Sequence, residues 1–354
     1  MSAEGGDQRS GVLTLRELAD RLDISVATAS RALAGHERIA RSTRERVAAA
    51  AREFGYVPNR AARQLVSGRS HFAGLVLPIR GPDFVDSFLG DFVTGLGEGL
   101  VQHGFDLILV TAPEGQSELS VLKTVVESGR ADGIVVPRVA EDDRRIAYLK
   151  KRRFPFIAHG RLREDNEDYH WLDSNGEKAF GEAFELLHAL GHRRFGLLTI
   201  DDPMTFKLLR QRGLTEAIAR RGDPDVTLRI ESAPRFDEPA RAAAVARMLE
   251  GNDRPTAIIG LFDQLALAAL TEAARRGLRV PDDLSVIGFD NISPSAYAPP
   301  GLTTFDTDIR GCARSIAGML AAITKDPSGP PLTRLIEPKL VKRGSHGPAP
   351  GRSS

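Results

Sequence analysis

Short apolar runs of β type alternate with helix-length amphipathic stretches over most of the chain after His71. We expect strands at 72–78, 105–111, 133–137, 155–160, 194–200, 226–231, 256–261 and 284–290. Helical patterns lie between them, and several stop at a glycine, as helices often do. Repeated β-α-β units predict parallel sheets with helices on both faces, and this many strands fits two sheets better than one. Small molecules bind such sheets beyond the carboxyl ends of the strands.

The composition excludes several classes of protein. The chain has 354 residues, 42% of them hydrophobic, which is enough to bury a sizeable core and excludes a mainly disordered chain. A single cysteine, Cys312, cannot form an internal disulfide. The N-terminus carries acids where a secretory signal needs a basic stretch and then an apolar one. No apolar run reaches the length of about 18 residues that a membrane span needs. We therefore expect a cytoplasmic protein without a membrane role.

Positive charge is concentrated at the front of the chain. Residues 1–70 hold 12 arginines, no lysine and 8 acids, whereas the remaining residues carry a small net negative charge. Seven of these arginines lie between Arg41 and Arg69, where they could face phosphates. A solvated helix face would explain the same charges, so charge alone leaves both interpretations open.

Residues 14–55 show the pattern of three short helices. Thr14 and Glu17 form a capping box that opens the first, over 15–22. Ser25 caps the second after a turn of only two residues, so these two helices must cross steeply, as in a helix-turn-helix unit. A third helix follows over 43–55. An ordinary three-helix element would share this spacing.

The second helix predicts an outward face that can read DNA. Val26, Ala27 and Arg31 lie opposite the residues that pack inward, which are Ala29, Ala32 and Leu33. Outward residues on such a helix can reach base edges in the major groove.

The stretch TLRELADRLDISVATASRAL, with TRERV, FGYVPN and AARQL after it, resembles the DNA-binding headpiece of the LacI/GalR family of bacterial transcription regulators. The region up to about residue 343 is similar to that family's periplasmic-binding-protein-like core. The chain also resembles, within the family, regulators of alpha-glucoside use, although no single motif carries that similarity. It departs from the family pattern at Leu22-Asp23, Ala34 and Ala40. Ala40 removes a cap of the third helix, a role that Ser42 could take over with Glu45.

The resemblance implies an all-α helix-turn-helix headpiece followed by an α/β core of two doubly wound subdomains joined by three crossovers. The expected boundaries are a disordered lead over 1–13, the headpiece over 14–57, a hinge helix and linker over 58–70, the core over 71–343 and a disordered tail over 344–354. Within the core, the first subdomain would comprise about 71–190 and 304–326, and the second about 193–301 and 328–343.

The resemblance also assigns roles on DNA. Val26 and Ala27 would touch base edges by apolar contact, and Arg31 would hydrogen-bond a guanine. Four hydroxyl groups would hold phosphates, namely those of Thr14, Ser25, Thr28 and Ser30.

In the hinge, Asn59 would cap a short helix containing Ala62, and Leu65 would enter the minor groove as an apolar wedge. One wedge from each subunit implies a homodimer on pseudo-palindromic, double-stranded operator DNA. The tail lacks the leucine heptads that tetramers in the family use, so we expect no tetramer.

The core positions matched by motif would bind a small-molecule effector. They are Phe84, Asp173, Arg210, Phe236, Phe262 and Asp290. Arg210 would bridge two sugar hydroxyls, and the two aspartates would accept hydrogen bonds from others. Phe262 stands where the family often has Asn, which favours a stacked sugar larger than a monosaccharide. Plain packing is the alternative for Phe84 and Phe236. No metal or cofactor is implied.

The function implied is a repressor of sugar-utilisation genes that a sugar releases from its operator, with an activator or dual regulator as the alternative. Two other classes remain more remote. An enzyme is disfavoured because the chain has no GxxxxGK[ST], HExxH or GxSxG motif, and Gly95-Leu96-Gly97-Glu98-Gly99 lies inside a helical pattern rather than after a strand. A solute-binding protein for transport would need export and would carry no headpiece.

Overall fold

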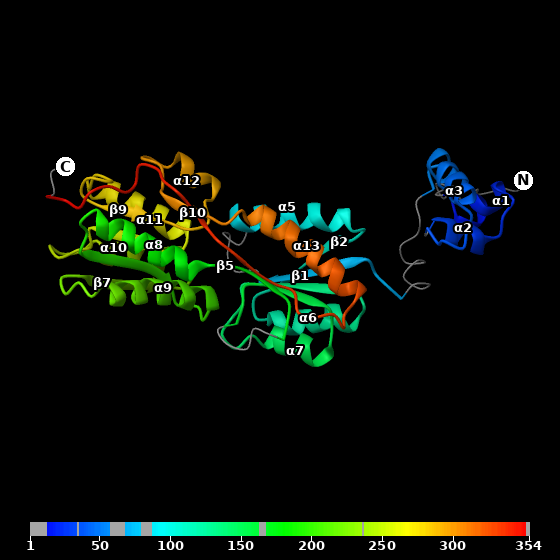
Figure 1. The fold of residues 1–354 in the computed structure, drawn as a ribbon, viewed down its shortest axis with the longest axis horizontal. Coiled ribbons are helices and arrows are strands. Elements are labelled where there is room, and N and C mark those ends of the chain that lie inside the picture. The colour runs from blue at the N-terminus through cyan, green and yellow to red at the C-terminus, as the bar shows by residue number, and fades with distance from the viewer. Residues whose placement is uncertain are drawn as a thin grey trace, which may run out of the picture. The chain divides into compact units, whose positions relative to one another are not determined.

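The computed structural model describes residues 13–33, 35–56, 68–78, 87–162, 168–235 and 237–351. The chain divides into two compact units, Met1–Ser70 and His71–Ser354 (Figure 1). We describe each unit by itself.

The first unit contains three helices, α1 (Leu15–Arg21), α2 (Val26–Leu33) and α3 (Arg41–Glu53). The predicted capping box opens α1, because Glu17 N donates to Thr14 Oγ1 and Thr14 N donates to the Glu17 carboxylate. In the turn before α2, Asp23 has a φ of 52°, a left-handed conformation that Asp tolerates better than most residues. The helix-turn-helix prediction is therefore confirmed.

The small core of this unit is built from Leu18 of α1, Ala32 of α2 and Val47 of α3, all of them buried. Helix α3 starts earlier than expected, and Ser42, the possible replacement for the missing cap, does not take over that role. Ala40 is the N-cap residue and makes no side-chain capping bond, and Ser42 already lies inside the helix.

The first subdomain of the second unit is a six-stranded parallel sheet in the order β11-β5-β4-β3-β1-β2. Its strands are β1 (Phe72–Pro78), β2 (Asp106–Ala112), β3 (Gly133–Pro137), β4 (Phe156–His159), β5 (Trp171–Ser174) and β11 (Thr333–Ile336). Helices α5 (Ser87–Gln102) and α13 (Ile309–Lys325) cover one face, and α6 (Glu118–Glu127) and α7 (Arg144–Arg152) cover the other (Figure 1).

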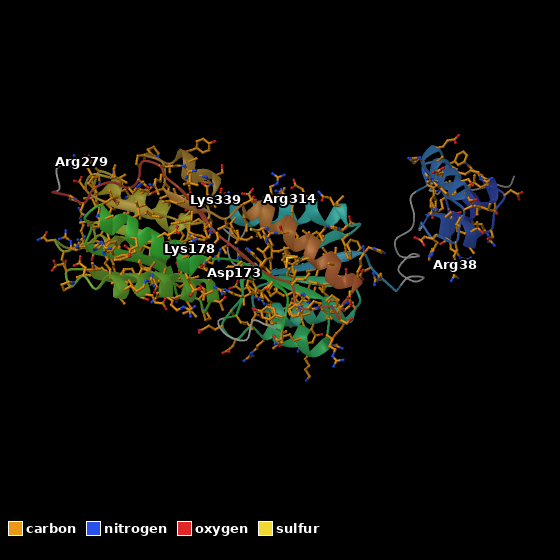
Figure 2. The ribbon with its side chains drawn as sticks, viewed as in Figure 1. Arg38, Asp173, Lys178, Arg279, Arg314 and Lys339 are labelled. Carbon is orange, nitrogen blue, oxygen red and sulfur yellow. The ribbon has the colours of Figure 1, made fainter. Side chains whose placement is uncertain are left out.

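Helices α5 and α13 pack at very short range. A Cβ atom on Gly95 would lie 2.3 Å from the Arg310 carbonyl oxygen, and one on Gly99 would lie 2.7 Å from the Ala317 Cβ. The glycines of Gly95-Leu96-Gly97-Glu98-Gly99 therefore serve helix packing. Glu98 pairs with Arg310 and, at 3.1 Å, with Arg314 of α13, which Figure 2 labels.

The second subdomain is a four-stranded parallel sheet in the order β7-β6-β8-β9. Its strands are β6 (Arg194–Ile200), β7 (Thr227–Ala233), β8 (Ala257–Gly260) and β9 (Ser285–Ile287). Its helices are α8 (Gly176–Ala189), α9 (Thr205–Arg221), α10 (Glu238–Met248), α11 (Asp263–Arg275) and α12 (Ser293–Tyr297). A small antiparallel pair, β10 (Thr304–Asp306) with β12 (Lys339–Val341), completes the unit.

The chain crosses between the subdomains three times, as expected, but at different places. Helix α8 belongs to the second subdomain, because Phe180 and Phe184 are buried in its core. Strand β11 belongs to the first, since it pairs with β5. Strand β10 joins the second, because Phe305 is buried in that core. The boundaries near 190, at 304 and over 328–343 therefore needed correction.

The segment after β12 does not fit the expectation of a disordered tail. Ser345 is fully buried and its backbone oxygen accepts a hydrogen bond from Val286 N at 2.7 Å, on the outer edge of β9. His192 Nε2 lies 3.0 Å from the Gly347 oxygen. Backbone hydrogen bonds to a sheet edge thus hold a Gly- and Pro-rich segment whose composition alone indicates disorder.

Candidate functional site

The structure confirms the predicted outward face of α2. Val26 is 40% exposed, Ala27 and Arg31 are exposed, and Ala29 and Ala32 are buried. Because these side chains are exposed within the first unit, this face of α2 can enter a DNA groove.

The hydroxyl groups expected at phosphates also cap helices. Ser25 Oγ accepts a hydrogen bond from Thr28 N at 3.1 Å and lies 2.8 Å from Thr28 Oγ1. The Thr14 backbone N–H and then its Oγ1 both donate to the Glu17 carboxylate, and these two bonds hold the pKa of Glu17 below its usual value. Ser30 is half-buried on α2. Caps of this kind fix the helix N-termini, where backbone N–H groups can also bind phosphate.

Some of the front arginines have structural roles. Arg44 donates to the Gly35 oxygen at 3.0 Å and Arg46 to the Leu22 oxygen at 3.2 Å, so both tie α3 to the preceding turns. Arg41 pairs with Glu45 on an exposed face. The predicted hinge residues Asn59, Ala62 and Leu65 lie outside the described residues.

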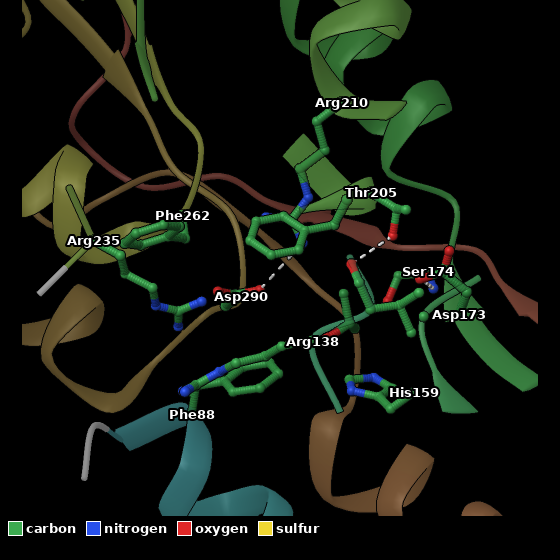
Figure 3. Close-up of a pocket in the computed structure, with 14 residues that line it drawn as sticks. Phe88, Arg138, His159, Asp173, Ser174, Thr205, Arg210, Arg235, Phe262 and Asp290 are labelled. Atoms are coloured by element: carbon green, nitrogen blue, oxygen red, sulfur yellow. Dashed lines mark hydrogen bonds and ion pairs between the residues drawn. The ribbon is translucent and has the colours of Figure 1, made fainter. Parts of the chain in front are cut away.

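In the second unit, a pocket lies where the carboxyl ends of the two sheets face each other (Figure 3). The first subdomain contributes Phe88, Arg138, His159 and Asp173, and the second contributes Thr205, Arg210, Arg235, Phe262 and Asp290. Most of these residues end a strand or follow one closely. This is where the strand pattern predicted a small-molecule site.

Arg210 is the central cation of the pocket. Its side chain is buried, with its guanidinium 3.8 Å from the Phe289 ring centre and 4.9 Å from that of Phe206. It donates to the Leu261 oxygen at 2.5 Å and lies 3.8 Å from Asp290 Oδ1. Burial lowers the pKa of Arg210, and the nearby Asp290 opposes that shift. The ring faces hold the guanidinium in place while it can still donate into the pocket.

The two predicted aspartates stand on opposite sides of the pocket. Asp173 lies one residue before the end of β5 and accepts from Arg161 Nε at 3.3 Å and from Ser174 N at 2.8 Å. Burial raises the pKa of Asp173 to about 6, although Arg161 lowers it. Asp290 follows β9 with a φ of 108°, which is rare for a residue other than glycine, and its N–H donates to the Phe305 oxygen at 2.9 Å. A left-handed residue at a ligand site is a typical place for backbone strain.

Of the three aromatic residues predicted at the site, the structure describes Phe262. Phe262 lines the pocket, with the Arg235 guanidinium 5.2 Å from its ring centre. Phe84 and Phe236 lie outside the described residues, so their expected contacts stay predictions.

The residues that line the pocket and that sequence reasoning missed include Phe88, Arg138, His159, Thr205 and Arg235. Their position in the sequence could have identified some of them, because Arg138 directly follows β3 and His159 ends β4. His159 stacks on Phe92 at 4.9 Å and on Phe88 at 6.0 Å. Burial lowers its pKa to about 4, so the ring is neutral near pH 7.

The described residues offer little for catalysis. Cys312 is buried on α13, its Sγ lies 3.1 Å from the Thr307 oxygen, and burial raises its thiol pKa to about 12. No group of three or more His, Cys, Asp or Glu side chains in the described ranges is arranged to hold a metal ion. Within those ranges, no helix has the length and apolar character that crossing a bilayer requires.

Two family models match the chain. Residues 14–59 match "Bacterial regulatory proteins, lacI family", and residues 184–346 match "Periplasmic binding protein-like domain". The HTH-type transcriptional regulator AglR of Rhizobium meliloti is 35% identical, with 96% of each chain covered. The chain belongs to the LacI family. It is accordingly a DNA-binding transcriptional regulator rather than an enzyme, as the sequence predicted.

Solved structures of LacI-family proteins share the fold. The lac repressor dimer bound to operator and the anti-inducer ONPF has a TM-score of 0.80 at 23% identity, with 95% of this chain and 99% of that one covered. The complex of the regulator CelR with cellobiose has a TM-score of 0.70 at 25% identity, with 94% and 99% covered. The prediction of a headpiece followed by a periplasmic-binding-protein-like core is confirmed.

Proposed function

We propose that this LacI-family regulator is a cytoplasmic homodimeric repressor of sugar-utilisation genes and that a neutral sugar releases it from its operator. The observation that carries the proposal is the pocket between the two subdomains. There Arg210 and two aspartates converge in a chain that also has a DNA-reading helix.

The chemistry of the pocket supports a polyhydroxylated ligand. Arg210 can donate two parallel hydrogen bonds to neighbouring hydroxyls, and Asp173 and Asp290 can accept from others. Phe262 and Phe88 offer apolar ring faces, on which the C–H face of a sugar can stack. The CelR–cellobiose complex, in which a regulator of similar fold binds a sugar, supports the proposal.

On DNA, Arg31 would donate two hydrogen bonds to a guanine, and Val26 and Ala27 would contact neighbouring base edges. Leu65 would act as the minor-groove wedge, with Asn59 and Ala62 in the same hinge segment. Each subunit would bind one half-site of a pseudo-palindrome, as the operator complex of the lac repressor dimer suggests.

In the first step of the test, the full chain is used to select the duplexes that it binds from a pool of random DNA sequences. Fluorescence anisotropy then measures operator affinity with and without each sugar of a mono- and disaccharide panel. We expect at least one sugar to weaken operator binding, and Arg210→Ala to lose this response while it still binds operator. Arg212→Ala is the matched control, because Arg212 lies on the same helix, pairs with Glu177 and does not line the pocket.

Two outcomes would count against the proposal. A sugar that strengthened operator binding would replace release by co-repression or activation. An Arg210→Ala protein that lost operator binding yet still bound sugar would show that Arg210 serves the other module.

A further inference from the structure

Arg161 contacts residues on both sides of the first crossover between the subdomains. It lies two residues after the end of β4. Its Nε donates to Asp173 Oδ2 at 3.3 Å, and its Nη2 donates to Glu177 Oε2 at 2.8 Å. Asp173 belongs to β5 of the first subdomain, whereas Glu177 lies in the first turn of α8 in the second. One guanidinium therefore joins the two ends of the crossover, which consists of residues 174–176.

Arg161 is held within the first subdomain. Its guanidinium lies 5.9 Å from the Trp171 ring centre, within the range over which an aromatic face attracts a cation. The side chain of Arg161 is 20% exposed, and that of Asp173 is 11% exposed. Salt and water screen partly buried ion pairs much less than they screen exposed pairs. The contact with Asp173 therefore fixes the guanidinium next to the pocket.

Glu177 is held within the second subdomain. Its Oε1 accepts a hydrogen bond from Arg212 Nε at 2.7 Å, and Arg212 lies on α9, two residues after Arg210. Helices α8 and α9 both pack into the core of the second subdomain. The pair of Glu177 with Arg212 thus stays inside one subdomain, whereas the pair of Glu177 with Arg161 links the two.

The position of these contacts restricts motion at the crossover. Hinges between domains are a few residues at the ends of elements, where changes in backbone angles are absorbed. Residues 174–176 connect β5 directly to α8 and are in such a position. A rotation there moves Glu177 relative to Asp173, so Arg161 must give up one of its two carboxylate contacts. A planar guanidinium can donate to both acids at once, which a smaller neutral side chain cannot do.

We propose that Arg161 is a positioning residue of the effector site, which presents the Asp173 carboxylate to the pocket and, through Glu177, holds the first crossover in one conformation. Neither Arg161 nor Glu177 is among the described residues that line the pocket, so Arg161 acts through Asp173. A ligand hydroxyl that donates to Asp173 competes with Arg161 and changes how tightly the guanidinium holds both acids. The inference rests on the proposed function only in taking Asp173 as an effector-binding residue.

Distances between the subdomains test the inference without a ligand. Lys151→Cys on α7 and Arg220→Cys on α9 would carry nitroxide labels, because both positions are exposed and the native Cys312 is buried. Labelled chains are mixed with an excess of unlabelled chains, so that a dimer holds one labelled copy. Double electron-electron resonance then gives the distribution of distances between the two labels. We expect Arg161→Gln to broaden this distribution and to add longer distances.

Two further variants separate the link between subdomains from a general loss of charge. Glu177→Gln keeps the size of the side chain but gives up the ion pair with Arg161, and it should broaden the same distribution. Arg212→Gln is the matched control, because it removes a cation from the same carboxylate without removing a link between the subdomains. The inference would be overturned if Arg161→Gln and Glu177→Gln both kept the original distribution, or if Arg212→Gln broadened it equally.

Operator binding gives the functional readout. Fluorescence anisotropy compares operator affinity with and without D-glucose, maltose, cellobiose, sucrose or trehalose. Arg161→Gln should reduce several-fold the loss of operator affinity that a sugar of this panel causes in the unmodified chain, and Arg212→Gln should keep that loss. An undiminished loss in Arg161→Gln would overturn the inference and leave the proposed function intact. If no sugar weakened operator binding by the unmodified chain, the proposed function would fail, while the label distances would still decide whether Arg161 holds the crossover.

Discussion

At the scale of single residues, two buried aspartates in this core share a raised pKa but have different surroundings. Burial raises the pKa of both Asp173 and Asp263 to about 6. Asp263 accepts hydrogen bonds from Ser295 Oγ, Thr304 Oγ1 and Ile292 N at 2.5–2.9 Å, so its oxygens serve the fold. Asp173 lines the pocket, where a ligand can reach it.

This contrast predicts a pH dependence of effector binding. A sugar hydroxyl that donates to Asp173 favours the ionised carboxylate, so binding lowers its pKa and releases a proton. Affinity should therefore rise as pH increases through about 6, by roughly tenfold between pH 5 and 7, and then level off. Titrations at pH 5, 6 and 7 measure the slope. Asp173→Asn should flatten it, and an equal slope in the variant would rule out Asp173 as the titrating group.

The same two acids also affect stability, with the opposite trend. An acid whose pKa is raised by folding keeps its proton longer in the folded chain than in the unfolded one. The folded state is then favoured at low pH, and that contribution is lost as pH rises from about 4 to 6. A gain in effector affinity over this pH range would therefore not come from a more stable folded state.

Family motifs in the sequence located the central residues of the pocket but not the residues around them. Arg210, Asp173, Phe262 and Asp290 were found because a family motif marks each of them, and all four line the pocket. Arg138 and His159 carry no motif and follow from strand ends alone. The role of Arg235 depends on how the β7–α10 connection folds back to the cleft, which no local pattern encodes.

At the scale of elements, the contact between α5 and α13 depends on glycines at particular turns. Gly95 has no room for a Cβ beside the Arg310 backbone, whereas Gly97, on another face of α5, has nothing within 4 Å. Gly95→Ala should lower the free energy of unfolding by about 1–3 kcal/mol through overpacking. Gly97→Ala should be neutral or stabilising by up to about 1 kcal/mol, because Ala favours helix. Thermal and urea unfolding compare the two. Equal effects would mean that α13 can move away at little cost.

Apolar strands and capped helices were predictable, while four short strands with polar residues were not. The eight expected strands all appear, because each has an apolar run bounded by turn residues. Strands β5, β10, β11 and β12 were missed, because each combines a length of 3 or 4 residues with polar side chains. Their absence from the prediction moved the expected crossovers, because it is β5 that ends the first pass through the first subdomain.

At the scale of the whole molecule, the chain should be a dimer in dilute solution. The operator complex that we propose needs two symmetric subunits, one for each half-site. Light scattering coupled to gel filtration should give about twice the chain mass of 38.4 kDa, with or without sugar. A mass of four subunits would contradict the expectation, and a single-subunit mass would exclude the symmetric operator complex that we propose.

We also expect sugar binding to need only the second unit and operator binding to need the first. The contacts of Met1–Ser70 and His71–Ser354 are concentrated within each unit. A protein of residues 71–354 should therefore keep sugar binding within about twofold of the full chain and lose operator binding. Calorimetry and anisotropy on the same preparation check both. Loss of sugar binding would mean that the first unit contributes to the pocket.

We expect the hydrogen bonds of the tail also to protect the protein from aggregation. Strand β9 is at the border of its sheet, and an uncovered border strand offers unpaired N–H and C=O groups to any passing chain. On that border, the Ser345 backbone oxygen accepts a hydrogen bond from Val286 N, and the Thr303 backbone oxygen accepts one from Gly288 N at 2.9 Å. A chain that stopped before Ser345 would leave the backbone N–H and C=O groups of Val286 without these partners on that border. Its solubility should fall before its melting temperature does.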